Sequence, residues 1–547
     1  MATLPTIPTI QSTGSAPVRY WPEGMPRELA LPEATLFDNL RATAEANPGK
    51  PLVIFNEQVL SYGEALARIE ALAAWLQQRC GVQRGDRVLL FSQNCPAYVV
   101  AYYAVLRADA VVVPVNAMCT ADELGYQARD AAARVALVGR EMAERAKACA
   151  GIDHVLLHDA DSLQSEASPG TTGWREVMAA ALRPAPHAAR PDDLSVLPYT
   201  SGTTGKPKGC RHTHRSMQAA LHGSRRWRSL GSDMVALSVA PMFHLLGMQN
   251  GLNLPILCGG TLVMLPRWDA AAAAQLIQRH RVSYWAAAPA MVVDFFAQPG
   301  LDALDLSSLK LLVSGGAAVP DAVSRMLLQR YGLVLNESYG MTETAAFLHC
   351  NPVGREKPCC LGVPTFGVDS RVIDPVTREE LPAFEVGELV TSGRQLMQGY
   401  WQRPEADAEA FIELDGKRYL RTGDLCHVDE DGYFFMRDRL KRMISVSGYK
   451  VWPAEVENHL YAHPAVHEAS VIGTPDARSG EAVKALLVLK PGVAFEASEF
   501  IAWAREHMAV YKAPRFVEVV SKLPKSGTGK ILWRELQNDE NHKGVRS

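Results

Sequence analysis

Short apolar, β-branched runs alternate with helical stretches between residues 36 and 314. Two of the helix starts, Ser61 with Glu64 and Thr120 with Glu123, have capping-box spacing. Strands that are apolar on both faces are typical of parallel sheets covered by helices on both sides. The alternation therefore predicts two doubly wound α/β subdomains, with ligands at the carboxyl ends of their strands. The predicted strands are 87–91, 110–115, 134–138, 194–200, 235–239, 261–265, 284–287 and 309–314.

The pattern changes near residue 361 to short strands and turns, including a strand at 386–391 and a turn at Asp431 and Gly432. This stretch predicts a small β-rich subdomain. Strand and helix then alternate on a smaller scale, with helices expected at 453–462 and 497–508, which indicates a small α+β domain. We expect the following organisation: a loose arm 1–34, a large N-terminal domain 35–436, a hinge 437–441, a mobile C-terminal lid domain 442–537 and a polar tail 538–547.

Composition restricts the class of protein. The chain has 547 residues, 48% of them hydrophobic, which is enough to form more than one domain. Its formal net charge of -3 argues against nucleic acid as a partner. Residues 1–34 lack the basic start and apolar core of a signal peptide, and no apolar run approaches the ~18 residues that span a bilayer. We expect a soluble, cytoplasmic protein without a transmembrane segment, whose ten scattered cysteines are reduced thiols.

The segment from Tyr199 to Gly209 reads Tyr-Thr-Ser-Gly-Thr-Thr-Gly-Lys-Pro-Lys-Gly. Glycines let backbone N–H groups approach an anion, hydroxyls donate to it, and ammonium groups neutralise it. It is not a Walker A loop, because only two residues separate Gly202 from Gly205, and Pro207 replaces the metal-binding hydroxyl. Pro207 also disfavours helical angles at Lys206. We predict an open loop that binds a polyphosphate tail; the alternative is a Gly/Thr-rich surface linker.

Two further segments carry polar groups suited to a nucleotide. In Asn-Glu-Ser-Tyr-Gly-Met-Thr-Glu, Tyr339 can stack on a purine, Thr342 can donate to a phosphate oxygen and Glu343 can hold Mg²⁺. In Tyr-Leu-Arg-Thr-Gly-Asp-Leu, Asp424 is an acceptor suited to a ribose diol. Taken alone, each segment is more often a capped turn without a ligand.

Together these segments resemble the adenylate-forming superfamily of acyl-CoA synthetases, luciferases and peptide-synthetase adenylation domains. The resemblance implies two steps: a carboxylate attacks the α-phosphate of ATP, giving an acyl-adenylate and pyrophosphate, and the thiol of coenzyme A then displaces AMP. It covers most of the chain, in the order of the family's motifs, which here are 199–209, 240–244, 336–343, 419–425, 432–457 and 524–531.

The resemblance implies a nucleotide site made of several of these segments. Thr342 matches the contact to the α-phosphate, Glu343 the magnesium ligand, and Asp424 and Arg439 the residues on the ribose hydroxyls. The positions that match the loop over the β- and γ-phosphates are Thr200, Ser201, Gly202, Thr203, Thr204 and Lys208. The positions that match the adenine wall are Gly315, Gly316, Ala317 and Tyr339.

Lys530, in Ser-Gly-Thr-Gly-Lys, matches the lysine that bridges the attacking carboxylate and the α-phosphate. Two anions must meet at phosphorus, so cations and oriented donors should supply most of the rate. A glycine-flanked lysine can arrive for that step and then leave, although a solvated surface lysine is the alternative. Lys441 matches the family's hinge position, where relatives carry Asp or Lys.

A mobile small domain would exclude water from the reactive anhydride and still admit the thiol. The resemblance implies that Ser447, Gly448 and Tyr449 then face the active site, with Gly448 allowing a pantetheine arm to pass. Arg267 aligns with a basic position that relatives use for the CoA phosphate. The alternative for Arg267 is an ordinary surface charge.

The acyl pocket follows from the resemblance and from apolar composition. Phe243 and His244 match the pocket mouth, where an aromatic residue or histidine gates the site, and His244 is counted among the catalytic residues. No aspartate follows, as it would in an amino-acid-activating domain. The remaining pocket candidates are Leu245, Met248, Met291, Gly340 and Met341. They favour a medium- or long-chain fatty acid, with an aryl or arylpropenoic acid as the alternative; ordinary core packing is the alternative for the two methionines.

Other functions share this fold. A luciferase-type oxygenase would be expected to end in a peroxisomal address, which the final residues lack. A peptide-synthetase fragment would continue beyond the seventeen residues after Lys530. A non-catalytic nucleotide or acyl sensor would not need Lys530, Glu343 and Asp424. The sequence does not decide whether the chain forms a homodimer. One departure from the family is Cys210-Arg211-His212, where aliphatic residues are commoner, and the sequence offers no reason for it.

Overall fold

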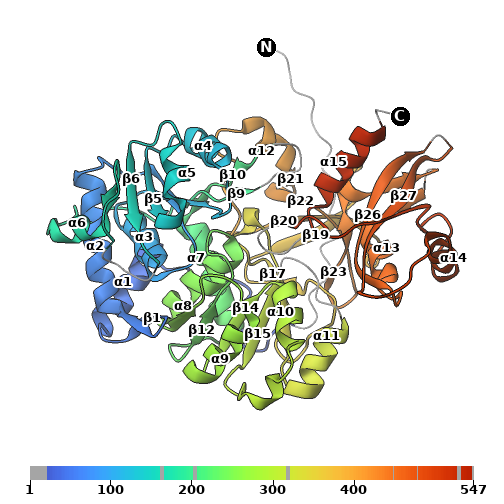
Figure 1. Cartoon of the computed structure of the whole chain (residues 1–547), viewed down its shortest axis with the longest axis horizontal. Helices are drawn as coiled ribbons and strands as arrows, with labels where there is room; N and C mark the ends of the chain where they lie inside the picture. Colours follow the sequence, from blue (N-terminus) through green and yellow to red (C-terminus); the bar gives the residue numbers. More distant parts are fainter. Residues whose placement is uncertain are drawn as a thin grey trace, which may run out of the picture. The chain divides into compact units, whose positions relative to one another are not determined.

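The computed structural model of the chain describes residues 21–160, 165–200, 206–315, 321–447, 449–476, 478–525 and 531–544. The chain forms two compact units, shown in Figure 1. The larger unit contains residues 20–369 and 392–412, and the smaller unit contains residues 370–391 and 413–547. Both are mixed α/β, which confirms the predicted fold class. Each unit is described by itself below.

A nine-stranded sheet forms one half of the larger unit. Its central strands run parallel, and the antiparallel strands β2, β17 and β18 lie at its two edges. Helices α9 (Ala270–His280) and α10 (Pro289–Phe296) bury one face of each against the sheet. The strand order is β18 (Val363–Pro364), β17 (His349–Cys350), β16 (Leu335–Tyr339), β15 (Leu311–Gly315), β14 (Tyr284–Ala287), β12 (Val235–Ser238), β13 (Thr261–Met264), β1 (Pro51–Phe55) and β2 (Gln58–Ser61).

A seven-stranded sheet forms the other half. It is parallel except for its edge strand β11. Helices α4 (Ala121–Asp130) and α5 (Ala143–Lys147) pack on one face, against Leu89, Val113 and Val138. The strand order is β11 (His212–Thr213), β8 (Leu194–Val196), β4 (Val111–Val115), β3 (Arg87–Phe91), β5 (Val135–Gly139), β6 (His154–His158) and β7 (Thr172–Gly173).

Helix α3 (Pro96–Arg107) is buried along its whole length after Pro96. A helix that is apolar all round needs protein on every side. Its Tyr103 donates a hydrogen bond of 2.8 Å to Asn253, which ends a π-helical stretch of the other half of the unit (Leu246–Asn253). The other helices of the unit include α1 (Leu36–Ala46), α2 (Tyr62–Gln78), α6 (Trp174–Ala179), α7 (His214–Trp227), α8 (Leu254–Cys258), α11 (Asp321–Met326) and α12 (Pro404–Ala410).

Local sequence signals predicted two helix starts. Both predicted capping boxes are present, at the N-termini of α2 and α4. The predicted strands are present, with ends that agree to within two residues, with one exception. The strand expected at 194–200 is divided into β8 and β9 (Tyr199–Thr200), so that prediction was wrong. Pro198, which lacks a backbone N–H, lies between the two pieces and cannot continue the ladder.

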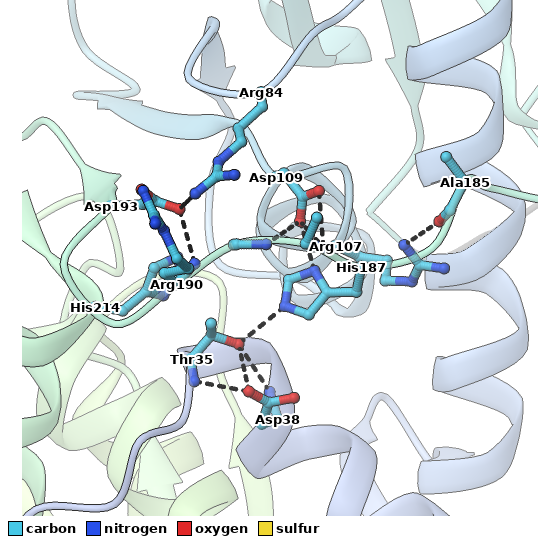
Figure 2. A network of polar contacts seen from close by, with 12 residues as sticks. Thr35, Asp38, Arg84, Arg107, Asp109, Ala185, His187, Arg190, Asp193 and His214 are labelled. Atoms are coloured by element: carbon cyan, nitrogen blue, oxygen red, sulfur yellow. Dashed lines mark hydrogen bonds and ion pairs between the residues drawn. The ribbon is translucent and has the colours of Figure 1, made fainter.

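A buried polar network fixes the connection between α6 and β8 (Figure 2). The Nδ1 atom of His187 lies 2.6 Å from Oδ1 of Asp109, and its Nε2 atom lies 3.1 Å from Oγ1 of Thr35, the N-cap of α1. Arg107 donates 2.9 Å to the carbonyl of Ala185. Burial would raise the pKa of Asp109, but hydrogen bonding to His187 and the charge of that ring help to hold it below its usual value. The network anchors this long connection to α1 and α3.

The described part of the predicted N-terminal arm is packed. The Trp21 ring lies 5.1 Å from that of Trp227 and 5.6 Å from that of Phe366, both edge-on. The Arg27 guanidinium lies 4.4 Å from the centre of the Trp21 ring. Residues 1–20 lie outside the described part of the chain. The aromatic contacts therefore hold residues 21–27 against the larger unit.

The smaller unit contains a β-rich part and an α+β part. In the first part, β23 (Phe434–Arg439) pairs with β22, in a sheet of order β19 (Asp369–Ile373), β20 (Gly387–Ser392), β22 (Lys417–Val428) and β21 (Phe411–Leu414). In the second part, β28 (Phe516–Val519) pairs with β27, in a sheet of order β25 (Tyr449–Val451), β24 (Ile444–Val446), β27 (Gly480–Leu489) and β26 (Val466–Asp476).

Three helices cover the second of these sheets. Helices α13 (Pro453–Leu460) and α14 (Ala497–His507) pack on one face through Val456, Leu460 and Phe500. Helix α15 (Trp533–Gly544) is held to β26 by Gln537, whose amide donates 2.7 Å to the carbonyl of Gly473. Among the described residues of the chain, no helix combines the length and apolarity needed to cross a bilayer.

Candidate active site

The predicted phosphate loop belongs to a short hairpin. Strand β9 pairs antiparallel with β10 (Lys208–Gly209), with Thr200 opposite Lys208. We call these two strands and their connection the phosphate hairpin. Ser201, Gly202, Thr203 and Thr204 lie outside the described residues. The segment does not run directly into a helix, since α7 begins only at His214.

The base of the phosphate hairpin is anchored to the end of α4. Tyr199 Oη donates 2.8 Å to Oδ2 of Asp130, and Arg403 forms an ion pair with the other oxygen. The indole N–H of Trp401 donates 3.0 Å to the Asp130 carbonyl. Burial, and then the hydrogen bond to Asp130, raise the pKa of Tyr199 well above its usual value, so this hydroxyl stays a donor.

A second anchor is the segment 397–401, which sequence analysis did not single out. It runs antiparallel to the strand leaving the hairpin: Trp401 N–H donates 2.7 Å to the Gly209 carbonyl, and Arg211 N–H donates 2.9 Å to the Gly399 carbonyl. Cys210 and Tyr400 form a bridge pair between them. Because Cys210 is fully buried in this pairing, a small side chain fits there.

His212 connects the same strand to the Thr342 turn. It is fully buried, and its Nε2 atom lies 2.7 Å from the Thr342 carbonyl, while Nδ1 lies 3.1 Å from Ser216 Oγ. Burial lowers the pKa of His212 to about 4, so the ring is neutral and donates from Nε2 to the carbonyl. These contacts give a reason for His212, one of the three residues at which the chain departs from the family pattern.

Glu343 lies in a 3₁₀ turn (Thr342–Thr344) that follows β16. Its side chain is only 7% exposed, and Tyr400 Oη donates a hydrogen bond of 3.0 Å to its Oε1 atom. Met397 N–H donates 2.9 Å to its carbonyl. The turn is crowded: a Cβ atom on Gly340 would lie 2.4 Å from the Ala346 backbone, so packing requires the glycine. The carboxylate is thus buried and held at a fixed place.

The adenine-wall candidates come from two adjacent parallel strands. Gly315 at the end of β15 is paired with Ser338 of β16, and a Cβ atom on it would lie 2.8 Å from the Ser338 carbonyl oxygen. Tyr339 is half-buried, and its ring centre lies 5.6 Å from that of His349. The register therefore brings Gly315 close to Tyr339, at the carboxyl ends of both strands. Gly316 and Ala317 lie outside the described residues.

The acyl-pocket candidates differ in exposure. Phe243 is half-buried and His244 is exposed, next to the start of the π-helical stretch. Leu245 and Met248 are buried, at 2% and 0% exposure. Met291 on α10 belongs to the core cluster of the nine-stranded sheet. Both methionines are buried, and their place in an acyl pocket stays a prediction. Met341 is half-buried beside Gly340.

The ribose candidates lie on neighbouring strands of the smaller unit. Asp424 of β22 faces Arg439 of β23, and Arg439 Nε lies 3.0 Å from Asp424 Oδ1. Asp424 is 1% exposed, and its own N–H donates 3.1 Å to Thr422 Oγ1. Lys441 belongs to a 3₁₀ turn (Leu440–Arg442) directly after β23. A buried carboxylate paired with one guanidinium can still accept from sugar hydroxyls, because it has two oxygens.

The remaining candidates are surface residues or lie outside the described part. Ser447 and Tyr449 are exposed, with Tyr449 stacked on Tyr511 at 4.9 Å. Gly448 and Lys530 are not among the described residues. Arg267 is exposed, and its Nε atom donates 2.9 Å to Gln93. No group of three or more metal-binding side chains occurs in the described ranges, so a cation here would depend on few protein ligands.

Comparisons with known proteins agree with this arrangement. The family model described as AMP-binding enzyme matches residues 40–401, and the model of the AMP-binding enzyme C-terminal domain matches residues 455–530. A long-chain-fatty-acid–CoA ligase of Bacillus subtilis (strain 168) is 34% identical over 553 residues, covering 95% of this chain and 98% of the relative. A feruloyl-CoA synthase of an Amycolatopsis species is 37% identical over 498 residues, covering 90% and 96%.

Solved structures give the same picture. The anthranilate CoA ligase AuaEII in complex with anthranoyl-AMP has a TM-score of 0.85 and 26% identity, covering 94% of this chain and 99% of that one. ATP-bound MatB from Rhodopseudomonas palustris has a TM-score of 0.85 and 28% identity, with 93% and 99% covered. The similarity therefore extends over both units of the chain.

Proposed function

This chain belongs to the AMP-binding enzyme family and is an ATP-dependent, AMP-forming acid–thiol ligase of the acyl-CoA type, and we propose that its acid is a medium- or long-chain fatty acid. The structural observation that supports ATP-dependent ligation is the segment 397–401, which bonds both to the strand leaving the phosphate hairpin and to Glu343. A phosphate-binding loop and a buried carboxylate joined in this way suit a polyphosphate with its counterion.

In the proposed first step, an oxygen of the fatty-acid carboxylate forms a bond to the α-phosphorus, and the bond from that phosphorus to the β-phosphate oxygen breaks. Pyrophosphate leaves. The phosphate hairpin, with Lys208, would hold the β- and γ-phosphates, Thr342 would donate to an α-phosphate oxygen, and Lys530 would neutralise the two anions as they meet. Asp424 and Arg439 would hold the ribose, and Tyr339 would stack on adenine.

In the proposed second step, the thiol of coenzyme A loses its proton and attacks the acyl carbon, and AMP leaves with one oxygen of the acid. The residues proposed to guide coenzyme A are Arg267, Ser447, Gly448 and Tyr449. A change in position of the C-terminal part about Lys441 would separate the two steps, so that water is excluded from the adenylate before the thiol enters.

Glu343 fits a magnesium ion. Mg²⁺ prefers hard oxygen ligands and is commonly held by one or two carboxylates together with substrate phosphates. A single buried carboxylate, fixed by the neighbouring Tyr400, meets that requirement. When bound, the ion would neutralise charge on the phosphates of ATP. Glu343 would hold it beside the phosphate hairpin.

Two observations support a fatty acid as the substrate. The residues next to the proposed pocket mouth are apolar, including Leu245 and Met248, so a charged acyl group would be poorly solvated there. The Bacillus subtilis relative, similar over nearly its whole length, is a long-chain-fatty-acid–CoA ligase. The second candidate is an arylpropenoic acid, which the 37% identity to a feruloyl-CoA synthase favours.

A panel of acids distinguishes the two. Initial rates of AMP formation would be measured with ATP, coenzyme A and saturated fatty acids of increasing length, and with ferulate, coumarate and anthranilate. Each methylene that enters an apolar site contributes ~0.8 kcal/mol, so kcat/KM should rise roughly fourfold per methylene until the site is filled. A higher kcat/KM for ferulate than for every fatty acid would favour the arylpropenoic alternative instead.

A further inference from the structure

Tyr400 belongs to none of the segments proposed above to contact substrate, but it touches two of them. Its hydroxyl donates 3.0 Å to Oε1 of Glu343, and the Nζ atom of Lys208 lies 5.1 Å from the centre of its ring. We propose that Tyr400 is a positioning residue that sets the orientation of the Glu343 carboxylate and its position relative to Lys208. The inference rests on the proposed roles of Glu343 and Lys208.

The backbone around Tyr400 is held on both sides. Trp401 N–H donates 2.7 Å to the Gly209 carbonyl, and Met397 N–H donates 2.9 Å to the Glu343 carbonyl. Five consecutive residues therefore join the hairpin strand to the turn that carries Glu343. The side chain of Tyr400 makes the same connection. Its hydroxyl contacts the Glu343 carboxylate, and its ring face lies below the Lys208 ammonium group.

The position of Tyr400 within the segment is itself fixed. Its N–H donates 2.6 Å to Oδ1 of Asp407, at the start of α12. The preceding Gly399 has a φ of 143°, and a Cβ atom there would lie 2.4 Å from the Asp407 carboxylate. A side chain at this position would displace that carboxylate. The Gly399-Tyr400 pair is thus built so that Asp407 can bind the tyrosine backbone.

Chemistry favours an oriented donor at this place. An ionised carboxylate has no proton to donate, so the Tyr400 hydroxyl donates to Oε1 of Glu343 and restrains the orientation of the carboxylate through that oxygen. Lys208 lies over the ring face, where the quadrupole attracts a cation. Such outer contacts usually control how well a carboxylate binds a metal ion.

This arrangement predicts coupling between magnesium and the tyrosine hydroxyl. The phenyl ring alone would still support Lys208, so Tyr400→Phe should leave the binding of metal-free ATP nearly unchanged. Without the hydroxyl, the Glu343 carboxylate would lose this hydrogen bond and the orientation it supports, so the enhancement of ATP binding by Mg²⁺ should fall. A purely structural role would weaken both kinds of binding equally.

The experiment measures the dissociation constant of ATP by calorimetry, in EDTA and in excess Mg²⁺. The proteins are the full chain, Tyr400→Phe, Glu343→Gln, the double variant, and Tyr62→Phe as a control. Tyr62 is the first residue of α2 and is far from Glu343 in the sequence. It is also buried, and its hydroxyl donates a hydrogen bond of 2.8 Å to the Gly260 carbonyl. Thermal unfolding confirms that each variant is folded.

We expect Tyr400→Phe to reduce the enhancement by Mg²⁺ roughly tenfold, with metal-free binding within a factor of about two. Tyr400→Phe should have no further effect on the enhancement in the Glu343→Gln background, and Tyr62→Phe should behave as the unchanged chain. Equal loss in EDTA and in Mg²⁺, no loss at all, or additive effects in the double variant would overturn the role of Tyr400. Absence of any Mg²⁺ enhancement in the unchanged chain would instead overturn the proposed role of Glu343.

Discussion

Arg439 Nε lies 3.0 Å from Oδ1 of Asp424, and the two residues face each other across the antiparallel strands β22 and β23. The carboxylate is almost fully buried, while Arg439 is 36% exposed. The pair therefore offers a carboxylate and a guanidinium to the same ribose. If it binds the ribose hydroxyls, each of its members should matter more for nucleotide affinity than for folding.

Asp424→Asn should weaken ATP binding roughly tenfold or more, because hydrogen bonds to a charged group contribute about 1.5–3 kcal/mol. Asparagine keeps the size of the side chain, so the fold should persist. Titration calorimetry with ATP measures the effect. The control is Asp415→Asn, which removes a partly exposed carboxylate paired with Arg371 in the same sheet. Similar loss of affinity in both variants would argue against contact of Asp424 with the ribose.

Lys530→Ala should lower the rate of adenylate formation by about 100-fold or more, since it removes the cation proposed at the reacting phosphorus. Thiolysis of a supplied acyl-adenylate should continue. The matched control is Lys525→Ala, which removes a lysine five residues earlier that pairs with Glu468. Pyrophosphate release and thioester formation from acyl-AMP are measured separately. Equal loss of both half-reactions would remove the assigned role.

Lys441→Pro should retain adenylate formation and impair thioester formation, because proline restricts φ within the 3₁₀ turn after β23. Lys441→Ala is the matched control, since it removes the same side chain without restricting the backbone. Pyrophosphate release and thioester formation, each measured in the presence of coenzyme A, separate the two steps. If the proline variant makes thioester as fast as the unchanged chain, the hinge lies elsewhere.

Acid should destabilise the larger unit through its buried histidines. Burial lowers the pKa of His158, His212 and His214 to about 4, from 6.5 for a solvated ring. Below pH 6.5, these three rings therefore bind protons in the unfolded chain but stay neutral in the folded chain. Each ring contributes stability that is complete above pH 6.5 and is lost as pH falls toward 4, at up to ~1.4 kcal/mol per pH unit.

The test compares the pH dependence of thermal unfolding in three proteins. His214 Nδ1 accepts 3.1 Å from the Leu36 N–H, at the first residue of α1. His214→Gln should flatten the fall in Tm between pH 6.5 and 4.5, although its Tm at pH 7.5 will be lower. His467→Gln, at an exposed histidine, should leave the slope unchanged. An unaltered slope in His214→Gln would show that this ring does not stay neutral in the fold.

Much of the fold could be predicted from local patterns. Capping boxes and β-branched runs act within a few residues, so the helix starts at Ser61 and Thr120 and nearly all parallel strands followed from the sequence. The division at Pro198 was missed because the strand prediction relied on apolar content and gave too little weight to the missing N–H.

The partners inside the candidate site could not be predicted, because they are distant in sequence. His212 reaches Thr342, and Tyr400 reaches Glu343, across 130 and 57 residues. A signal was present in the Gly399-Tyr400-Trp401 run, where a glycine precedes two large aromatic residues. Nothing in that run predicts a carboxylate as the partner of Tyr400. Likewise, apolar composition alone could not assign Met248 and Met291 to a pocket or to the core.

The central claim is that the acid attacks the α-phosphorus of ATP. A medium- or long-chain fatty acid with both carboxylate oxygens replaced by ¹⁸O would be converted with ATP and coenzyme A, and the AMP analysed by mass spectrometry. The account predicts one ¹⁸O atom in each AMP, none in pyrophosphate, and one retained in the thioester. Label in inorganic phosphate with ADP as the nucleotide product, or AMP without label, would contradict it.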